Sequence, residues 1–323
     1  MYEPPIFVVG LPRSGSTMLE LAIARSPGVL RFGEALFLSP WRRDFRYFLR
    51  KRVGDVSRDE RLREMIEIIF SDRGAIPGLT GTFWRLERVK AVGDEAFKQK
   101  LFQSLKASDR SPGSIFRIIL RDITEFNGYR RCCVPFPVHV HHLPTLARWF
   151  PDAKIVHITR DPRAIAVSKT NDPGGTARYN EMYPALKPLI RKAMMAFVVV
   201  QYIDASRVSV RFQDQPNYLL VRYEDLVLQP EETMRQICQF AGIEYRNGML
   251  EREDNRTQRS SITGESRTKP EAKAASKWME AITPFENWMV TVLTRNSMAR
   301  FKFDPASHPV YAHKLQEQCG IAR

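Results

Sequence analysis

Residues 10–17 read Gly-Leu-Pro-Arg-Ser-Gly-Ser-Thr and have the spacing of a phosphate-binding loop. They match the pattern G-x-x-x-x-G-K-[ST] except at Ser16, which stands where the pattern has a lysine that reaches the terminal phosphates of a nucleoside triphosphate. Arg13 must then supply the cation, and its planar guanidinium suits two oxygens of one phosphate or sulfate group. The residues expected to line this anion site are Arg13, Ser14, Gly15, Ser16 and Thr17.

The segments on either side of the loop must hold it in place. Residues 6–9 are apolar and mostly β-branched, as in a buried parallel strand, and residues 18–24 are good helix formers. In a strand, loop and helix unit, the loop N–H groups and the positive end of the helix face an anion. An ordinary glycine turn is the alternative, and the flanking elements favour the anion site.

A second predicted strand, over residues 153–159, is followed by Arg160, Asp161 and Pro162. Asp161 and Pro162 are typical of the N-cap and first residue of a helix, so Arg160 is expected at the carboxyl tip of the strand. Ligands of open α/β sheets bind at that edge, which places Arg160 beside the loop. Ser168, about two turns into the helix, could bind a second phosphate held by Arg160. The alternative for Arg160 is a surface ion pair.

A third predicted strand covers residues 218–223, and helical stretches separate the three strands. Recurring β-then-α units with right-handed crossovers predict an α/β fold, a P-loop-type parallel sheet flanked by helices. Residues from about 35 to 130 predict a helical cap over the edge of the sheet. The charged segment from about 251 to 275, rich in Ser, Thr and Gly, predicts a mobile loop. We expect one domain over residues 1–323.

Composition limits the partners and the location. The net charge of +14 and the pI of about 9.8 favour anionic partners, and nothing in the sequence points to a specific nucleic acid. The four cysteines lack the spacing of a disulfide scaffold, and no carboxylate or histidine cluster has metal-ligand spacing. No targeting segment precedes the first strand. We therefore expect a cytoplasmic protein without a metal.

Four motifs occur along the chain, namely residues 12–17, Arg160 with Ser168, residues 223–226 (Tyr-Glu-Asp-Leu) and residues 276–278 (Ser-Lys-Trp). Together they resemble the sulfotransferases that use 3′-phosphoadenosine 5′-phosphosulfate (PAPS). The resemblance implies that the loop binds the 5′-phosphosulfate and that Arg160 and Ser168 bind the 3′-phosphate. It also implies that Tyr223 contacts the nucleotide, and that Lys277 and Trp278 belong to a segment that closes over the donor. An ordinary helix with Trp278 inward and Lys277 in water is the alternative for the last motif.

Residues 31–34 read Arg-Phe-Gly-Glu and resemble the branch of tyrosylprotein sulfotransferases and their bacterial relatives, where a Gly-Glu pair supplies the catalytic base. The resemblance implies that Glu34 takes the proton of the acceptor hydroxyl, while Arg13 stabilises the transferring group. Glu34 could instead cap a helix or form an ion pair. His139 is the second candidate base, because cytosolic sulfotransferases use a histidine in this region and a neutral imidazole suits the task.

Pro135 departs from the family pattern, which usually places a lysine there. That lysine neutralises charge on the bridging oxygen, so its absence removes a contribution of the kind that can be worth several kcal/mol. Arg13 or Lys277 could compensate.

Residues 41–52 predict a basic amphipathic helix, with Trp41 and Phe48 on one side and Arg42 and Arg46 on the other. Such a helix could make peripheral contact with an anionic membrane or shape a pocket for an amphiphilic acceptor, or it could pack its aromatic side on the core.

The sequence therefore predicts a PAPS-dependent sulfotransferase (EC 2.8.2) that acts on a hydroxyl of a lipid, glycan, small molecule or protein tyrosine. A P-loop kinase using ATP and magnesium is one alternative, based on the glycine spacing alone. A non-catalytic, membrane-associated nucleotide-binding protein is the other, based on Pro135 and the basic helix. The sequence does not predict an oligomeric state.

Overall fold

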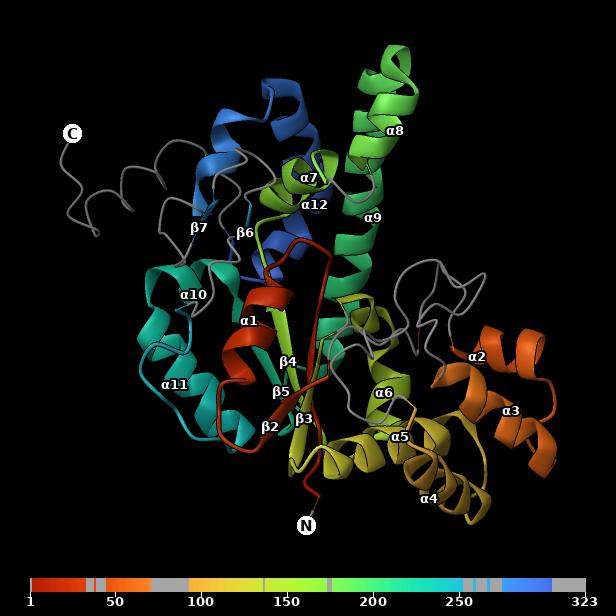
Figure 1. Ribbon diagram of the computed structural model, residues 1–323. Helices are drawn as coiled ribbons and strands as arrows, with labels where there is room; N and C mark the ends of the chain where they lie inside the picture. Colours follow the sequence, from red (N-terminus) through yellow and green to blue (C-terminus); the bar gives the residue numbers. More distant parts are fainter. Residues whose placement is uncertain are drawn as a thin grey trace.

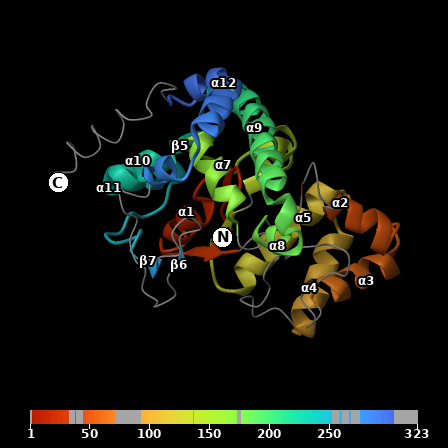
Figure 2. The same ribbon diagram turned by 90° about the horizontal axis from the view of Figure 1, so that it is seen from above.

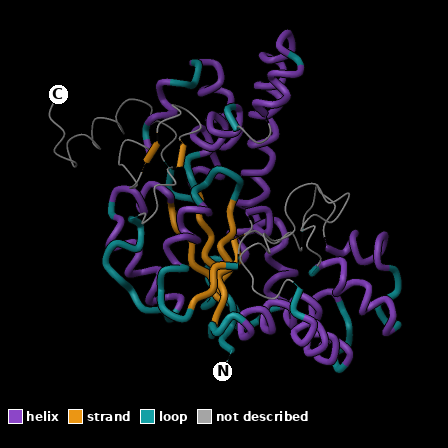
Figure 3. The backbone as a smooth tube through the Cα atoms, viewed as in Figure 1, coloured by secondary structure: helices purple, strands orange, loops and turns teal. Residues whose placement is uncertain are grey.

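A five-stranded parallel sheet forms the centre of the computed structural model, which describes residues 2–32, 38, 45–70, 93–135, 137–172, 176–251, 258–259, 266–267 and 275–303 (Figures 1 and 3). The strand order is β2-β3-β1-β4-β5, and every pairing is parallel. The strands are β1 (Ile6–Gly10), β2 (Val29–Arg31), β3 (Arg131–Pro135), β4 (Lys154–Thr159) and β5 (Tyr218–Arg222). The predicted α/β fold with a parallel sheet is confirmed.

Helices cover both faces of this sheet (Figure 2). Alternating side chains of β1 face opposite sides, so Ile6 and Val8 pack in one apolar cluster and Phe7 and Val9 in another. On the Ile6 side lie α1 (Ser16–Ile23), α10 (Tyr223–Leu228) and α11 (Pro230–Ala241). On the Phe7 side lie α5 (Pro112–Phe126), α6 (Leu143–Trp149), α7 (Pro162–Thr170), α9 (Lys187–Phe212) and α12 (Pro284–Arg300). The sheet is thus buried on both faces, as the apolar strands require.

The other elements are short or lie beside the sheet. One side of the molecule holds α2 (Phe45–Phe48), the π-helical turn η1 (Leu49–Val53), α3 (Asp59–Ile69) and α4 (Glu95–Lys106), of which α4 packs on α5. The short elements around the carboxyl edge include η3 (Pro137–His142), α8 (Thr176–Met182), η4 (Pro184–Leu186) and η6 (Lys277–Glu280). A small antiparallel pair joins β6 (Gln258–Arg259) to β7 (Ser266–Arg267). The rest of the predicted mobile loop over residues 251–275 lies outside the described residues, apart from both ends of that range.

The predicted amphipathic helix over residues 41–52 is described only from Phe45 onward. In that part Phe48, Leu49 and Val53 are buried in the core. The apolar side therefore packs inward, which was one of the alternatives, and the described residues leave no apolar face there for a lipid. The periodicity of the sequence predicted an apolar side of this helix but not the core residues that cover it.

Helix α9, with the turn before it, is long and apolar enough to span a bilayer by length and composition. Within Pro184–Phe212 one window of 18 residues has a mean hydropathy of 1.3, and half of that window is buried inside the protein. Core helices of globular proteins have the same properties, and α9 packs against α7 and α12. Length and composition alone therefore do not place α9 in a membrane.

Candidate functional site

The loop between β1 and α1 turns through two residues with left-handed backbone. Arg13 has a φ of 78° and Gly15 a φ of 102°, and the Ser14 N–H donates to the Leu11 carbonyl at 3.1 Å. Helix α1 begins directly afterwards, at Ser16. The first N–H groups of a helix have no partner within the helix and lie at its positive end. The loop therefore has the geometry of an anion site at the carboxyl edge of β1.

The side chain of Ser14 lies inside this loop. It is 0% exposed, and its Oγ has no hydrogen-bond partner within the described part of the chain. A buried hydroxyl left unsatisfied costs about 1–3 kcal/mol, which an anion accepting its proton would offset. Ser16 is also buried, whereas Thr17 is exposed. The residues present thus fit a phosphate or sulfate group.

Gly15 lies against the ring of Tyr223, the first residue of α10. A Cβ atom at Gly15 would come within 2.6 Å of the Tyr223 Cδ2 atom. The close approach brings the end of β5 to the loop after β1, although β4 separates the two strands in the sheet. Gly15 is required here both for its positive φ and for the space that its missing side chain leaves.

Replacing Gly15 by alanine should therefore weaken nucleotide binding by at least about tenfold, since the loop must shift away from Tyr223. Gly54→Ala is the matched control, because Gly54 also has a positive φ, of 89°, but a Cβ atom added there would meet nothing within 4 Å. Both variants should lose about 1 kcal/mol of folding stability from backbone strain. Only Gly15→Ala should lose affinity in calorimetry, and equal affinities would show that the contact with Tyr223 is unimportant.

Arg13, Ser168, Arg160 and Tyr223 meet beside the loop. Arg13 Nε donates to Ser168 Oγ at 3.1 Å, and Arg160 Nη1 donates to the Arg13 carbonyl at 3.4 Å. The Arg160 guanidinium carbon lies 4.3 Å from the centre of the Tyr223 ring. Four predicted site residues from three segments of the chain therefore lie together. Their two guanidinium groups would both be stabilised by an anion bound among them.

Asp161, the neighbour of Arg160, is paired with Arg163. Arg163 Nε and Nη2 donate to the two Asp161 carboxylate oxygens at 2.9 and 2.6 Å. The same carboxylate accepts the Arg163 N–H at 2.9 Å and so forms the predicted N-cap of α7. The Asp161 charge is thus used to start the helix and to balance a fully buried Arg163.

Glu224 is a buried acid next to the same group. Its Oε1 accepts the Asp161 N–H at 3.1 Å. Burial raises the pKa of Glu224 to about 7; Arg160 lowers it and the Asp161 charge raises it further. At neutral pH this carboxyl therefore carries less negative charge than an ordinary glutamate, and it offsets the charge of Arg160 less.

Lys277 and Trp278 lie in η6, which packs on α7. Trp278 is 1% exposed, and the Arg163 guanidinium carbon lies 4.7 Å from the centre of its ring. Lys277 is also buried rather than in water. The structure thus places this motif against the helix that carries Ser168, and its role over the donor stays a prediction.

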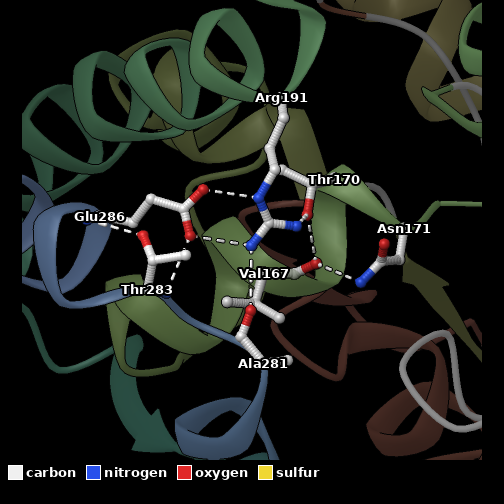
Figure 4. A network of polar contacts seen from close by, with 7 residues as sticks. All are labelled: Val167, Thr170, Asn171, Arg191, Ala281, Thr283 and Glu286. Atoms are coloured by element: carbon white, nitrogen blue, oxygen red, sulfur yellow. Dashed lines mark hydrogen bonds and ion pairs between the residues drawn. The ribbon is translucent and has the colours of Figure 1, made fainter. Parts of the chain in front are cut away.

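Arg191 of α9 joins η6 to α7 (Figure 4). Its Nε and Nη2 donate to the Glu286 carboxylate at 2.6 and 2.9 Å, and Nη2 also donates to the Ala281 carbonyl at 3.0 Å. Its Nη1 donates to Thr170 Oγ1 at 3.2 Å. Thr170 is two residues beyond Ser168 and Ala281 is three beyond Trp278, so one guanidinium fixes the spacing of the two segments.

Sequence reasoning missed three of these residues, Arg163, Glu224 and Arg191. Arg163 and Glu224 stand next to recognised motif residues, in Arg-Asp-Pro-Arg and Tyr-Glu-Asp, which was the available signal. No sequence motif next to Arg191 pointed to its role.

Glu34 lies outside the described residues, but the strand before it is described. Arg31 Nε and Nη2 donate to the Glu20 carboxylate of α1 at 2.7 and 3.1 Å, and the Phe32 N–H donates to the Cys133 carbonyl at 3.0 Å. Because β2 is parallel to β3 and β1, the chain leaves Phe32 toward the carboxyl edge of the sheet. The role of Glu34 as base stays a prediction.

His139, the second candidate base, is fully buried in η3. Its Nε2 accepts the Leu38 N–H at 3.3 Å, and burial together with nearby His142 lowers its pKa to about 3. A neutral imidazole that holds the backbone at Leu38 has a structural use. These observations favour Glu34, and the assignment of the base is still a prediction.

Pro135 is buried at the end of β3, in register with Val8 of β1. The residue that departs from the family pattern therefore lies beside the strand that leads into the loop. Among the described residues, no group of three or more His, Cys, Asp or Glu side chains could hold a metal ion.

Comparison with known sequences decides the family. The model described as "Sulfotransferase family" matches residues 4–247, three quarters of the chain. The chain belongs to the sulfotransferase family. Membership confirms the predicted resemblance and the activity class, the transfer of a sulfuryl group.

Two curated sulfotransferases are similar in sequence to this chain. A putative protein-tyrosine sulfotransferase of Caenorhabditis briggsae is 24% identical over 254 residues, 77% of this chain and 69% of the relative. The omega-hydroxy-beta-dihydromenaquinone-9 sulfotransferase of Mycobacterium bovis is 25% identical over 265 residues, 75% of this chain and 63% of the relative. The chain thus spans somewhat less than two thirds of the mycobacterial relative and slightly more of the other.

The fold is shared with solved sulfotransferase domains. The domain of the Synechococcus PCC 7002 olefin synthase is 19% identical, with a TM-score of 0.56 and coverage of 94% of this chain and 96% of that one. The domain of the curacin biosynthetic pathway has a TM-score of 0.54 at 17% identity, covering 94% and 99%. At these identities the likeness concerns the fold alone.

Proposed function

We propose that this sulfotransferase moves a sulfuryl group from PAPS to the hydroxyl of an acceptor. The observation that carries the proposal is the meeting of Arg13, Ser168, Arg160 and Tyr223 beside the buried Ser14 hydroxyl. The loop offers one anion site, and Arg160 with Ser168 offers a second. Two neighbouring anion sites suit a nucleotide that carries phosphate groups at both its 5′ and its 3′ positions.

Each residue then has a defined task. The N–H groups of residues 14–17 and the Arg13 guanidinium hold the 5′ end of the nucleotide. Arg160 and Ser168 hold its 3′-phosphate, and the Tyr223 ring keeps the Arg160 guanidinium in place. Lys277 and Trp278 cover the nucleotide from η6. The donor supplies the activated sulfuryl group, so the protein needs orientation and oxygen stabilisation rather than a nucleophile of its own.

Glu34 is proposed as the base that takes the acceptor's proton. Pro135 has no side-chain donor for the bridging oxygen, so that task falls to a cation that is present. Arg13 is our choice, because its guanidinium is already held at the loop by Ser168. Lys277, buried against α7, is the second choice.

The acceptor is proposed to be a hydroxyl-bearing molecule. One relative is named for a hydroxylated menaquinone and another for protein tyrosine, and both groups are hydroxyls. The proposal names only a hydroxyl group as the acceptor and does not name the molecule that carries it. The cytoplasmic location and the single domain stay predictions.

Calorimetry with 3′,5′-bisphosphoadenosine (PAP), the product of the donor, tests the proposal. We expect PAP to bind with a Kd in the micromolar range or below, equally well with EDTA and with magnesium, and at least about tenfold more tightly than ADP. Binding of ATP that requires magnesium, with no preference for a 3′-phosphate, would instead support a P-loop kinase and overturn the proposal.

A further inference from the structure

An apolar tip projects from the molecule where α8, η4 and the first turns of α9 meet (Figure 1). Its side chains are between 49% and 64% exposed; they are Tyr179, Met182, Tyr183, Leu186 and Leu189. The Tyr183 N–H donates to the Tyr179 carbonyl at 2.9 Å, and the Leu186 N–H to the Tyr183 carbonyl at 3.0 Å, so the chain keeps turning through this stretch. The five exposed side chains thus lie within eleven residues of the chain.

The position of the tip separates it from the core of the protein. Figure 1 shows α8 and the start of α9 extending beyond the sheet and its covering helices. They extend on the side to which the carboxyl ends of the strands point, which is also the side of the Arg13 and Arg160 site. A cluster of large, exposed apolar side chains at a projecting point is typical of a surface that binds a membrane or another protein.

The charges around the tip select an anionic partner. Between residues 173 and 203 the one acidic residue is Glu181, whereas the sequence has four basic residues there, of which Arg191 is paired with Glu286. Of these, Lys187 and Lys192 are exposed next to the tip. Tyrosines, leucines and a methionine flanked by lysines have the composition of segments that lie in the interface of a membrane.

We propose that the apolar tip docks onto an anionic lipid bilayer, with Tyr179, Tyr183 and Leu189 among the headgroups and Lys187 and Lys192 at the lipid phosphates. A second copy of the chain suits the tip less well, because a stable interface needs about 800 Å² on each partner and a narrow point offers little flat area. The tip, rather than residues 41–52, is then the lipid-facing surface. Docking on the side of the site would bring that site toward molecules held in the bilayer.

Sedimentation with lipid vesicles tests the proposal without donor or acceptor, so its outcome is independent of the proposed function. The protein should bind vesicles of phosphatidylcholine with phosphatidylglycerol at least about tenfold more strongly than vesicles of phosphatidylcholine alone. Leu189→Glu should lose at least about tenfold of that binding. Val210→Glu is the matched control on the same helix, since Val210 is 40% exposed near the opposite end of α9, and it should bind like the parent protein.

An unchanged melting temperature shows that each variant is folded. Replacing Lys187 and Lys192 together by serine should remove the preference for phosphatidylglycerol. Absence of vesicle binding in the parent protein, or equal losses in Leu189→Glu and Val210→Glu, would overturn the proposal. It would also be overturned if light scattering showed that Leu189→Glu converts a dimer into a monomer, since the tip would then join two copies of the chain.

Discussion

Replacing Arg160 by alanine should weaken PAP binding by about 10²–10³-fold, while ADP binding changes by less than about threefold. Arg160 is 8% exposed, and its guanidinium donates to the Arg13 carbonyl and lies on the Tyr223 ring, so it is held in one place before the ligand arrives. Charge-assisted hydrogen bonds to a phosphate contribute about 1.5–3 kcal/mol each, and two of them account for the expected loss. ADP lacks the 3′-phosphate and therefore loses little.

Two further variants sharpen this result. Arg160→Lys keeps the charge but not the two-pronged geometry, so it should recover only part of the affinity. Arg207→Ala removes an exposed arginine from α9 and should bind PAP like the parent protein. If Arg160→Ala weakened PAP and ADP equally, Arg160 would support the fold of the site rather than bind the 3′-phosphate. Melting curves for each variant separate a local change from a loss of folding.

Local pattern explains why the elements of this site could be predicted. The loop over residues 10–17, the strand before Arg160 and the cap at Asp161 each depend on neighbours within a few residues, and all three lie where the sequence indicated. The edge of the sheet then follows from topology, because the carboxyl ends of parallel strands lie on one side. That reasoning brought Arg13, Arg160 and Ser168 to the same edge.

Pairings between distant segments could not be predicted. Arg13 and Ser168 are 155 residues apart, and Arg191 and Glu286 are 95 apart, so no local pattern connects them. The sequence also showed an apolar side on residues 41–52 without showing that Phe48 and Leu49 are covered by the core. Amphipathic periodicity predicts that one face of a helix is buried. Only the packing in the structure shows which residues cover that face.

Replacing Glu34 by glutamine should lower turnover by about 10²–10⁴-fold and leave PAP affinity unchanged within about twofold. Glutamine keeps the size and the hydrogen-bonding capacity of the side chain but cannot take a proton. The acceptor need not be known for this measurement, because water can serve as a slow acceptor. Release of labelled sulfate from the donor, followed with saturating protein, reports the loss directly.

His139→Asn is the comparison that decides which residue is the base. The imidazole is 0% exposed and accepts the Leu38 N–H, so its replacement should lower the melting temperature while the rate for each folded molecule changes by only a few fold. Its lowered pKa, about 3, makes it a weak base at neutral pH. The opposite result, a large loss of rate in His139→Asn with Glu34→Gln still active, would show that His139 in η3 is the base. Glu34 follows β2, whose end is fixed by Glu20 and Cys133, so we expect the proton to be taken at the carboxyl edge of the sheet.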